Sequence, residues 1–137
     1  MLPKPHLVFG AIFSVILYIT GFSVFSCVVI LLSSILIDFD HYLYYIIKKK
    51  DFSLKRAYIW HERLDKFHKP MMMVFHTVEF LILVLILSYF NRIFIFIFIG
   101  MIFHSILDML DMLKKGIFYA REYSLIRYLV SDKSKYL

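Results

Sequence analysis

The chain has 137 residues, of which 61% are hydrophobic and 19% aromatic, and its mean hydropathy is +0.77. Such values exclude an ordinary soluble domain and predict an integral membrane protein made of one membrane domain, residues 1–137. The lysine run at residues 48–50 predicts an anchor that contacts anionic lipid headgroups, and no nucleic-acid partner is expected despite the net charge of +6.

The sequence predicts an all-α fold, a bundle of four short transmembrane helices, at residues 6–20, 22–38, 71–90 and 92–113. Residues 7–37 form one uninterrupted apolar stretch, which is longer than the roughly 20 residues that a span needs. Two interpretations are open: one long tilted helix, or a hairpin of two short helices that turns at Thr20 and Gly21. Asn91 and Arg92 supply a comparable turn between the last two segments.

Positive charge is divided unequally between the two ends of this bundle. In the hairpin interpretation all lysines and arginines except Arg92 lie on one side, in the N-terminus, the loop 41–70 and the tail 114–137. The positive-inside rule makes that side cytoplasmic. The expected location is therefore the cell membrane, with several crossings and with the basic loops in the cytoplasm.

Two further segments have the pattern of amphipathic helices that lie in the membrane interface. Residues 51–69 repeat apolar groups at helical spacing, along a stripe made of Leu54, Tyr58, His61, Leu64 and His68. His61 and His68 would face the membrane or the mouth of a site, and they are candidate substrate contacts. The tail at 117–130 has aromatic residues suited to headgroup level and predicts a second interfacial helix.

Ionisable residues recur inside the apolar segments, where each costs about 3 kcal/mol and is retained mainly when it pairs, binds a ligand or lines water. They are Asp38, Asp40 and His41 in the second segment, His76 and Glu79 in the third, and His104 and Asp108 in the fourth. In an up-and-down bundle these places meet at one membrane face. The hairpin would add His6 to that face, whereas one long helix would put His6 on the opposite side.

The spacing of these residues limits their geometry. His76 and Glu79 are three positions apart, and His104 and Asp108 are four apart, so each pair projects from one stripe of a helix. Residues 38 and 40 point in different directions on a regular helix and can converge only if the helix ends between them. A helix end or turn is therefore expected at residues 38–41.

Imidazole together with carboxylate is the ligand set of zinc, manganese or iron rather than of magnesium or calcium alone. The candidate metal ligands are His6, Asp38, Asp40, His41, His76, His104 and Asp108. Because this set exceeds the needs of one tetrahedral ion, one or two divalent ions are expected, with zinc preferred. Glu79 or Asp40 would then accept the proton of a metal-bound water molecule.

The order of these motifs resembles that of the YdjM-like membrane-bound metal-dependent hydrolases. The matching positions are His6 with Gly10, the DxDH at residues 38–41, His76 with Thr77, and Gly100 with His104 and Asp108. The chain departs from the family pattern at Ile37, where the family has proline, at Val78, where it has serine, and at His68, which lies further upstream than the family's His-Arg pair. The resemblance implies a metal site and, through similarity to zinc-dependent phospholipases, a phosphoester substrate.

Three functions from different classes are compatible with this pattern. The first is a hydrolase that attacks a lipid or other amphiphilic ester from the cytoplasmic leaflet. The second is an ion or proton transporter, although the far half of the predicted bundle offers no polar path. The third is a non-enzymatic module in which metal or buried polar pairs hold the helices together and the basic loop recruits a partner. Di-iron oxidation is less favoured, because the HxxxH and HxxHH boxes are absent. The sequence leaves the oligomeric state open.

Overall fold

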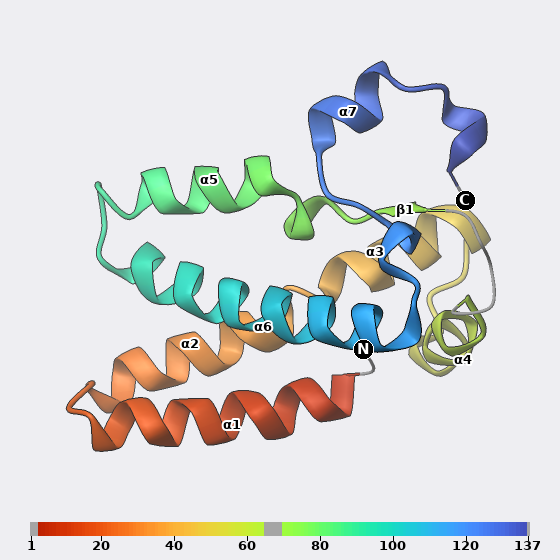
Figure 1. Cartoon of the computed structure of the whole chain (residues 1–137). Coiled ribbons are helices and arrows are strands. Elements are labelled where there is room, and N and C mark those ends of the chain that lie inside the picture. The colour runs from red at the N-terminus through yellow and green to blue at the C-terminus, as the bar shows by residue number, and fades with distance from the viewer. Residues whose placement is uncertain (1–2, 65–69, 137) are drawn as a thin grey trace.

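The computed structural model describes residues 3–64 and 70–136, and this part of the chain is mostly helical, as predicted (Figure 1). The α-helices are α1 (Pro3–Ile19), α2 (Val24–Leu36), α3 (Phe39–Lys49), α4 (Leu54–Leu64), α5 (Val78–Leu87), α6 (Ile93–Lys115) and α7 (Leu125–Val130). Short 3-10 turns lie at η1 (Val74–His76), η2 (Phe118–Ala120) and η3 (Lys133–Lys135). Two strands, β1 (Met71–Met72) and β2 (Arg121–Glu122), pair in parallel.

The first apolar stretch forms a hairpin, which decides between the two interpretations of residues 7–37. After α1, Gly21 has a φ of 103°, a left-handed value that glycine adopts without a steric penalty. The Ser23 hydroxyl then caps α2 by accepting the backbone N–H of Ser26 at 3.1 Å. The start of α1 consequently lies at the same end of the bundle as the end of α2, which brings His6 to the other candidate ligands.

The apolar helices form a row in which α1 contacts α2, α2 contacts α6 and α6 contacts α5, and α1 also contacts α6. Along the helix axes, Figure 1 shows the turns at 20–23 and 88–92 at one end of the helices and α4 and α7 towards the other end. A Cβ atom at Gly100 would lie 2.1 Å from Ser33 Oγ and 2.3 Å from the Ile30 carbonyl oxygen. Glycine therefore lets the backbones of α2 and α6 approach closely, as small residues do between membrane helices.

Two helical segments within the described residues are long and apolar enough to cross a membrane, Val24–Lys49 and Ile93–Lys115. The first comprises α2 and α3, which are separated by a break at Ile37 and Asp38. The predicted turn at 38–41 is thus present as a local break, but the chain then continues as helix up to Lys49. The helices Pro5–Ile19 and Val78–Leu87 are apolar but shorter.

Two expected helices are interrupted. The segment 71–90 is helical mainly over α5, because β1 and η1 precede it and Thr77 caps it by accepting the N–H of Phe80. The tail 117–130 is not one interfacial helix, because β2 pairs with β1 and leaves only Leu125–Val130 as α-helix. Both differences arise from one long-range strand pairing, which local periodicity does not reveal.

Candidate metal centre

Four side chains converge at the end of the helices near α4 and α7, opposite the turns at 20–23 and 88–92. Asp38 lies at the break before α3, His76 ends η1, and His104 and Asp108 are one turn apart on α6. One potential ligand atom of each lies within 4.8 Å of those of the others. His76, His104 and Asp108 are buried, whereas Asp38 is partly exposed. We call these four residues the His/Asp cluster.

The separations inside the His/Asp cluster are close to those around a small divalent ion. Nε2 of His76 lies 3.2 Å from Nε2 of His104, and the latter lies 3.3 Å from Asp38 Oδ1 and 3.6 Å from Asp108 Oδ2. Nε2 of His76 lies 3.8 Å from each of the same two carboxylate oxygens. Neighbouring ligand atoms around a tetrahedral zinc ion are about 3.3–3.6 Å apart when the bonds are about 2.0–2.2 Å long.

Hydrogen bonds behind the two histidines determine which nitrogens face inward. Nδ1 of His104 donates to the Ser34 carbonyl at 2.6 Å, and Nδ1 of His76 donates to Asp40 Oδ2 at 3.1 Å. In a neutral ring whose Nδ1 carries the proton, Nε2 presents only a lone pair. Two lone pairs at 3.2 Å repel each other unless a cation lies between them. The pair therefore requires either a metal ion or a shared proton.

Asp40 and His6 lie one hydrogen bond outside the His/Asp cluster, although both are candidate ligands in the sequence. Besides holding the His76 ring, Asp40 is buried at the start of α3. Nε2 of His6 donates to Asp108 Oδ1 at 3.0 Å, so that Asp108 Oδ2 is the oxygen near His104. The His6 ring also stacks on the His104 ring, with centroids 3.8 Å apart. Such outer partners orient metal ligands and fix their tautomers.

His41 and His61 lie on the cavity side of the His/Asp cluster. Nε2 of His41 is 3.6 Å from Asp38 Oδ1, and His41 forms a second group of potential ligands with Asp40 and His76. Nε2 of His61 donates to the His41 carbonyl at 2.8 Å, and the two rings meet edge to face. His61 thus lies beside the His/Asp cluster and lines the adjacent cavity, whereas His68 is outside the described residues.

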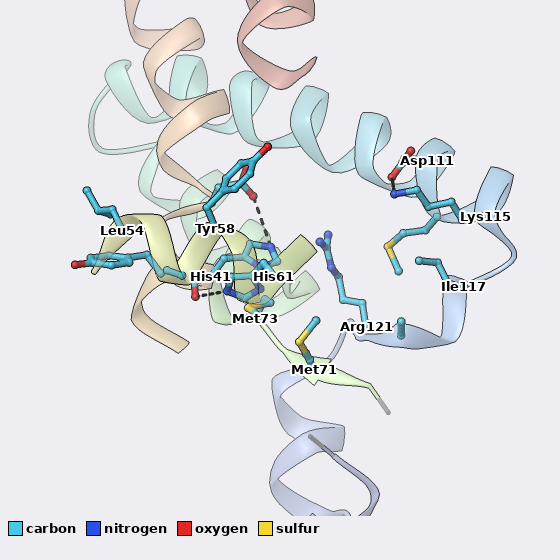
Figure 2. A pocket seen from close by; sticks show the side chains of 15 residues that line it. His41, Leu54, Tyr58, His61, Met71, Met73, Asp111, Lys115, Ile117 and Arg121 are labelled. Carbon is cyan, nitrogen blue, oxygen red and sulfur yellow. Dashed lines mark hydrogen bonds and ion pairs between the residues drawn. The ribbon is translucent and has the colours of Figure 1, made fainter. Parts of the chain in front are cut away.

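A cavity of about 350 Å³ opens beside the His/Asp cluster (Figure 2). Asp38 and His41 form part of its wall on the cluster side. Much of the remaining wall is apolar and includes Leu54, Ala57, Tyr58, Met71, Met73 and Ile117. Leu54, Tyr58 and His61 of the predicted stripe line this cavity from α4.

Asp51 fixes α4 in place as one wall of the cavity. Nε and Nη2 of Arg56 each donate to its carboxylate at 2.7 Å, and the Tyr45 hydroxyl of α3 also donates to it. The hydrogen bonds from Arg56, followed by that from Tyr45, hold the pKa of Asp51 below its usual range. This carboxylate therefore links the end of α3 to the start of α4.

Arg121 reaches the His/Asp cluster from the C-terminal tail. Its Nη2 donates to Asp108 Oδ2 at 2.5 Å, and its side chain is 9% exposed and lines the cavity. Sequence reasoning missed this residue, because the tail has the composition of an interfacial helix. The pairing of Arg121 with Met71 in the β1–β2 ladder places it here, and no local motif announces that pairing.

Glu79, a predicted proton acceptor, has a different role among the described residues. Its carboxylate accepts hydrogen bonds from the Ser124 hydroxyl at 2.6 Å and from the backbone N–H groups of Leu125 and Ile126 at 2.9 and 3.2 Å. These groups form the start of α7, where backbone N–H groups lack partners within the helix. Glu79 therefore anchors α7 on α5, and the structure does not bring it to the His/Asp cluster.

The His/Asp cluster is a buried group of side chains that could hold a metal ion. No family model, curated protein or solved structure matches the chain. The features of the molecule that bear on function are therefore the cluster, the cavity and the surfaces around them.

Proposed function

We propose that the protein is a membrane-embedded hydrolase that binds one divalent transition-metal ion, with zinc preferred, at the His/Asp cluster. The observation that carries this proposal is the facing pair of Nε2 atoms, 3.2 Å apart and each held from behind by a hydrogen bond at Nδ1. The Asp108 carboxylate completes the donor set, and together with the nearby Asp38 carboxylate it would balance the charge of the ion. A bound ion would supply Lewis acidity and lower the pKa of a water molecule towards neutrality.

The four residues of the His/Asp cluster differ in their access to the cavity. The side chain of Asp38 is 16% exposed, whereas those of His76, His104 and Asp108 are 1% exposed or less. Catalytic zinc sites keep one position open, usually with three protein ligands. We therefore assign the three buried residues as ligands and Asp38 as the proton acceptor at the cavity wall.

Asp38 would accept a proton from the attacking water as its oxygen bonds to phosphorus. The bond between phosphorus and the ester oxygen breaks, and the leaving alcohol takes up the proton that Asp38 has received. Atoms and charge then balance for a phosphoester hydrolysed to an alcohol and a phosphate. Asp38 is suited to this role because it is the member of the His/Asp cluster that both faces the ligand atoms and lines the cavity.

A single ion is favoured over two by the position of Asp40. Its Oδ2 already accepts the backbone N–H of Phe75 at 3.0 Å and the His76 Nδ1 proton. A second ion bound at this oxygen would compete with these hydrogen bonds. Asp40 therefore acts as the outer carboxylate that orients the His76 ligand.

We place the bundle in a membrane, with α1 and α5 accompanying the two long helical segments as a four-helix membrane domain. Large apolar side chains are exposed along it, including Ile19 at 77%, Tyr89 at 90% and Phe90 at 77%. Soluble monomers rarely expose contiguous apolar surface on this scale. The basic residues gather at the end that carries the His/Asp cluster, so the site would open on the cytoplasmic side.

The resemblance to the YdjM-like hydrolases supports the same assignment. The residues that carry the resemblance include the DxDH at 38–41, His76, His104 and Asp108, and these are the residues that form or adjoin the His/Asp cluster. Gly100, another motif position, contributes by letting α6 approach α2. A non-enzymatic bundle held by a proton shared between His76 and His104 is the competing interpretation, and it predicts a chain that binds no metal.

The test is the metal content of the detergent-purified chain after incubation with zinc, or in separate samples with manganese or iron(II), followed by gel filtration. We expect about one ion per chain for the wild type, loss of the ion in His76→Ala and His104→Ala, and retention in the matched control His61→Ala. We expect Asp38→Asn to keep the ion but to lose hydrolysis of a chromogenic phosphodiester such as bis-(4-nitrophenyl) phosphate. A wild-type chain that binds none of zinc, manganese or iron would overturn the proposal in favour of the shared proton.

A further inference from the structure

A buried arginine in the cavity wall is short of acceptors. The guanidinium of Arg121 has five N–H groups, and within residues 3–64 and 70–136 its recorded hydrogen bond is the one from Nη2 to Asp108. Figure 2 shows this side chain directed into the cavity, opposite Tyr58 and His61 of α4. Because its side chain is only 9% exposed, solvent is a poor substitute for the missing acceptors. A ligand that supplies oxygen acceptors would satisfy this group.

The charges around the cavity favour an anion. The formally charged residues that line it are Asp38, Asp111, Lys115 and Arg121. Lys115 and Asp111 form an ion pair with a distance of 2.8 Å between Nζ and Oδ2. A divalent ion at the His/Asp cluster would be balanced by the Asp38 and Asp108 carboxylates. Arg121 then remains as the positive charge that faces the cavity contents.

Much of the remaining cavity wall is apolar and suits the apolar part of a ligand. Leu54 and Ala57 of α4 line one part, Met71 and Met73 line the part formed by β1 and the residue before η1, and Ile117 follows α6. Methionine side chains adapt to irregular apolar shapes, and the volume of about 350 Å³ is typical of a small-molecule site. This part of the wall is thus apolar.

We propose that this cavity binds a phosphoryl group attached to an apolar chain, with Arg121 as the residue that recognises the phosphoryl oxygens. The planar fork of arginine matches two phosphoryl oxygens. Because Arg121 donates to Asp108, a phosphoryl group bound by Arg121 would lie next to the His/Asp cluster. The apolar chain lies along α4 and β1. This assignment rests on the proposed function, because it names the substrate class of the same site.

The experiment measures binding of octylphosphonate, which hydrolysis does not consume, to the full chain in phosphatidylcholine nanodiscs. Equilibrium dialysis with and without zinc, against empty nanodiscs, gives Kd values for octylphosphonate, octanol and inorganic phosphate. We expect octylphosphonate to bind at least about 10-fold more tightly than either of the others, since it alone uses both parts of the cavity. We expect Arg121→Met to raise its Kd by about 10- to 100-fold without loss of bound zinc.

Matched variants separate recognition from folding. Arg127→Met, on the exposed part of α7, should bind octylphosphonate as the wild type does. Arg121→Lys should lie between wild type and Arg121→Met, because it keeps the charge and loses the fork. Ala57→Trp should weaken the binding of octylphosphonate, because the indole would fill the apolar part of the cavity.

Three results would overturn the inference: equal Kd values for octylphosphonate and octanol, unchanged binding in Arg121→Met, or inorganic phosphate binding as tightly as octylphosphonate. The last would mean a site for free phosphate. A chain that binds octylphosphonate through Arg121 yet never binds zinc would overturn the proposed function and leave this assignment intact.

Discussion

At the scale of single residues, the most informative atoms are the outer nitrogens of His76 and His104. Their partners, Asp40 and the Ser34 carbonyl, turn both Nε2 atoms towards each other. A buried polar network without a metal could instead have one of the two rings flipped, so that its N–H donates to the Nε2 lone pair of the other ring. The observed arrangement is instead the one that suits a cation between the rings.

This role of Asp40 predicts a graded loss of metal affinity. Asp40→Asn removes the charge that holds the Nδ1 proton of His76, so zinc affinity should fall about 10- to 100-fold, measured by competition with a chromogenic chelator. Asp132→Asn, the same change in the exposed tail, is the control and should leave the affinity unchanged. If Asp40→Asn removed zinc as completely as His104→Ala, Asp40 would be a direct ligand instead.

The sequence could predict which residues meet but not how each is used. The position of His6, His76, His104 and Asp108 within apolar segments was sufficient to predict their convergence, because unpaired ionisable groups are costly in apolar surroundings. Whether His6 contacts the ion or the back of Asp108 depends on which carboxylate oxygen each neighbour reaches. That is a matter of sub-ångström packing, which residue spacing does not encode.

At the scale of elements, the contact between α2 and α6 sets the geometry of the site. Gly100→Ala would place a methyl group 2.1 Å from Ser33 Oγ and 2.3 Å from the Ile30 backbone oxygen, so the helices must separate. We expect the free energy of unfolding to fall by about 1–3 kcal/mol. Zinc affinity should also decrease, because His104 of α6 donates to the Ser34 carbonyl of α2.

The control for this change is Gly10→Ala, where the nearest atoms belong to side chains. Its Cβ would lie 2.9 Å from Ser34 Oγ and 3.2 Å from Leu31 Cδ1, and both atoms can rotate away. Thermal unfolding in detergent and zinc competition should therefore show a smaller effect than for Gly100→Ala. Equal effects of the two substitutions would mean that the α2–α6 contact does not control the site.

The anchoring of α7 by Glu79 gives a second prediction for an element. Glu79→Ala removes the acceptor of three hydrogen bonds from the start of α7, so the tail after Tyr123 should be cleaved faster in limited proteolysis. Zinc content and zinc affinity should stay at the wild-type level, because Glu79 lies outside the His/Asp cluster. A loss of zinc with unchanged proteolysis would restore Glu79 to the site.

At the scale of the whole molecule, the two hairpins were predictable and the tail was not. Thr20-Gly21 and Asn91-Arg92 interrupt apolar stretches with residues that favour turns, and the structure places turns there. The position of Arg121 depends on pairing between β1 and β2, which are distant in sequence and only two residues long. Such a pairing leaves no periodic signal in the sequence. The cavity wall that contains Arg121 could therefore not be predicted.

The last prediction concerns membrane topology, namely whether the α1–α2 and α5–α6 hairpins cross the whole bilayer. The ten residues of α5 extend about 15 Å, half of a hydrocarbon core, so crossing depends on α6 and on α2 with α3. In a Cys27→Ser background, Thr20→Cys should react with a membrane-impermeant thiol reagent on intact cells, whereas Ser134→Cys should react only after permeabilisation. Reaction of both positions only after permeabilisation would mean that the apolar helices enter from the cytoplasmic face without crossing. The His/Asp cluster would then lie at the same face, but the protein would be anchored in one leaflet instead of spanning both.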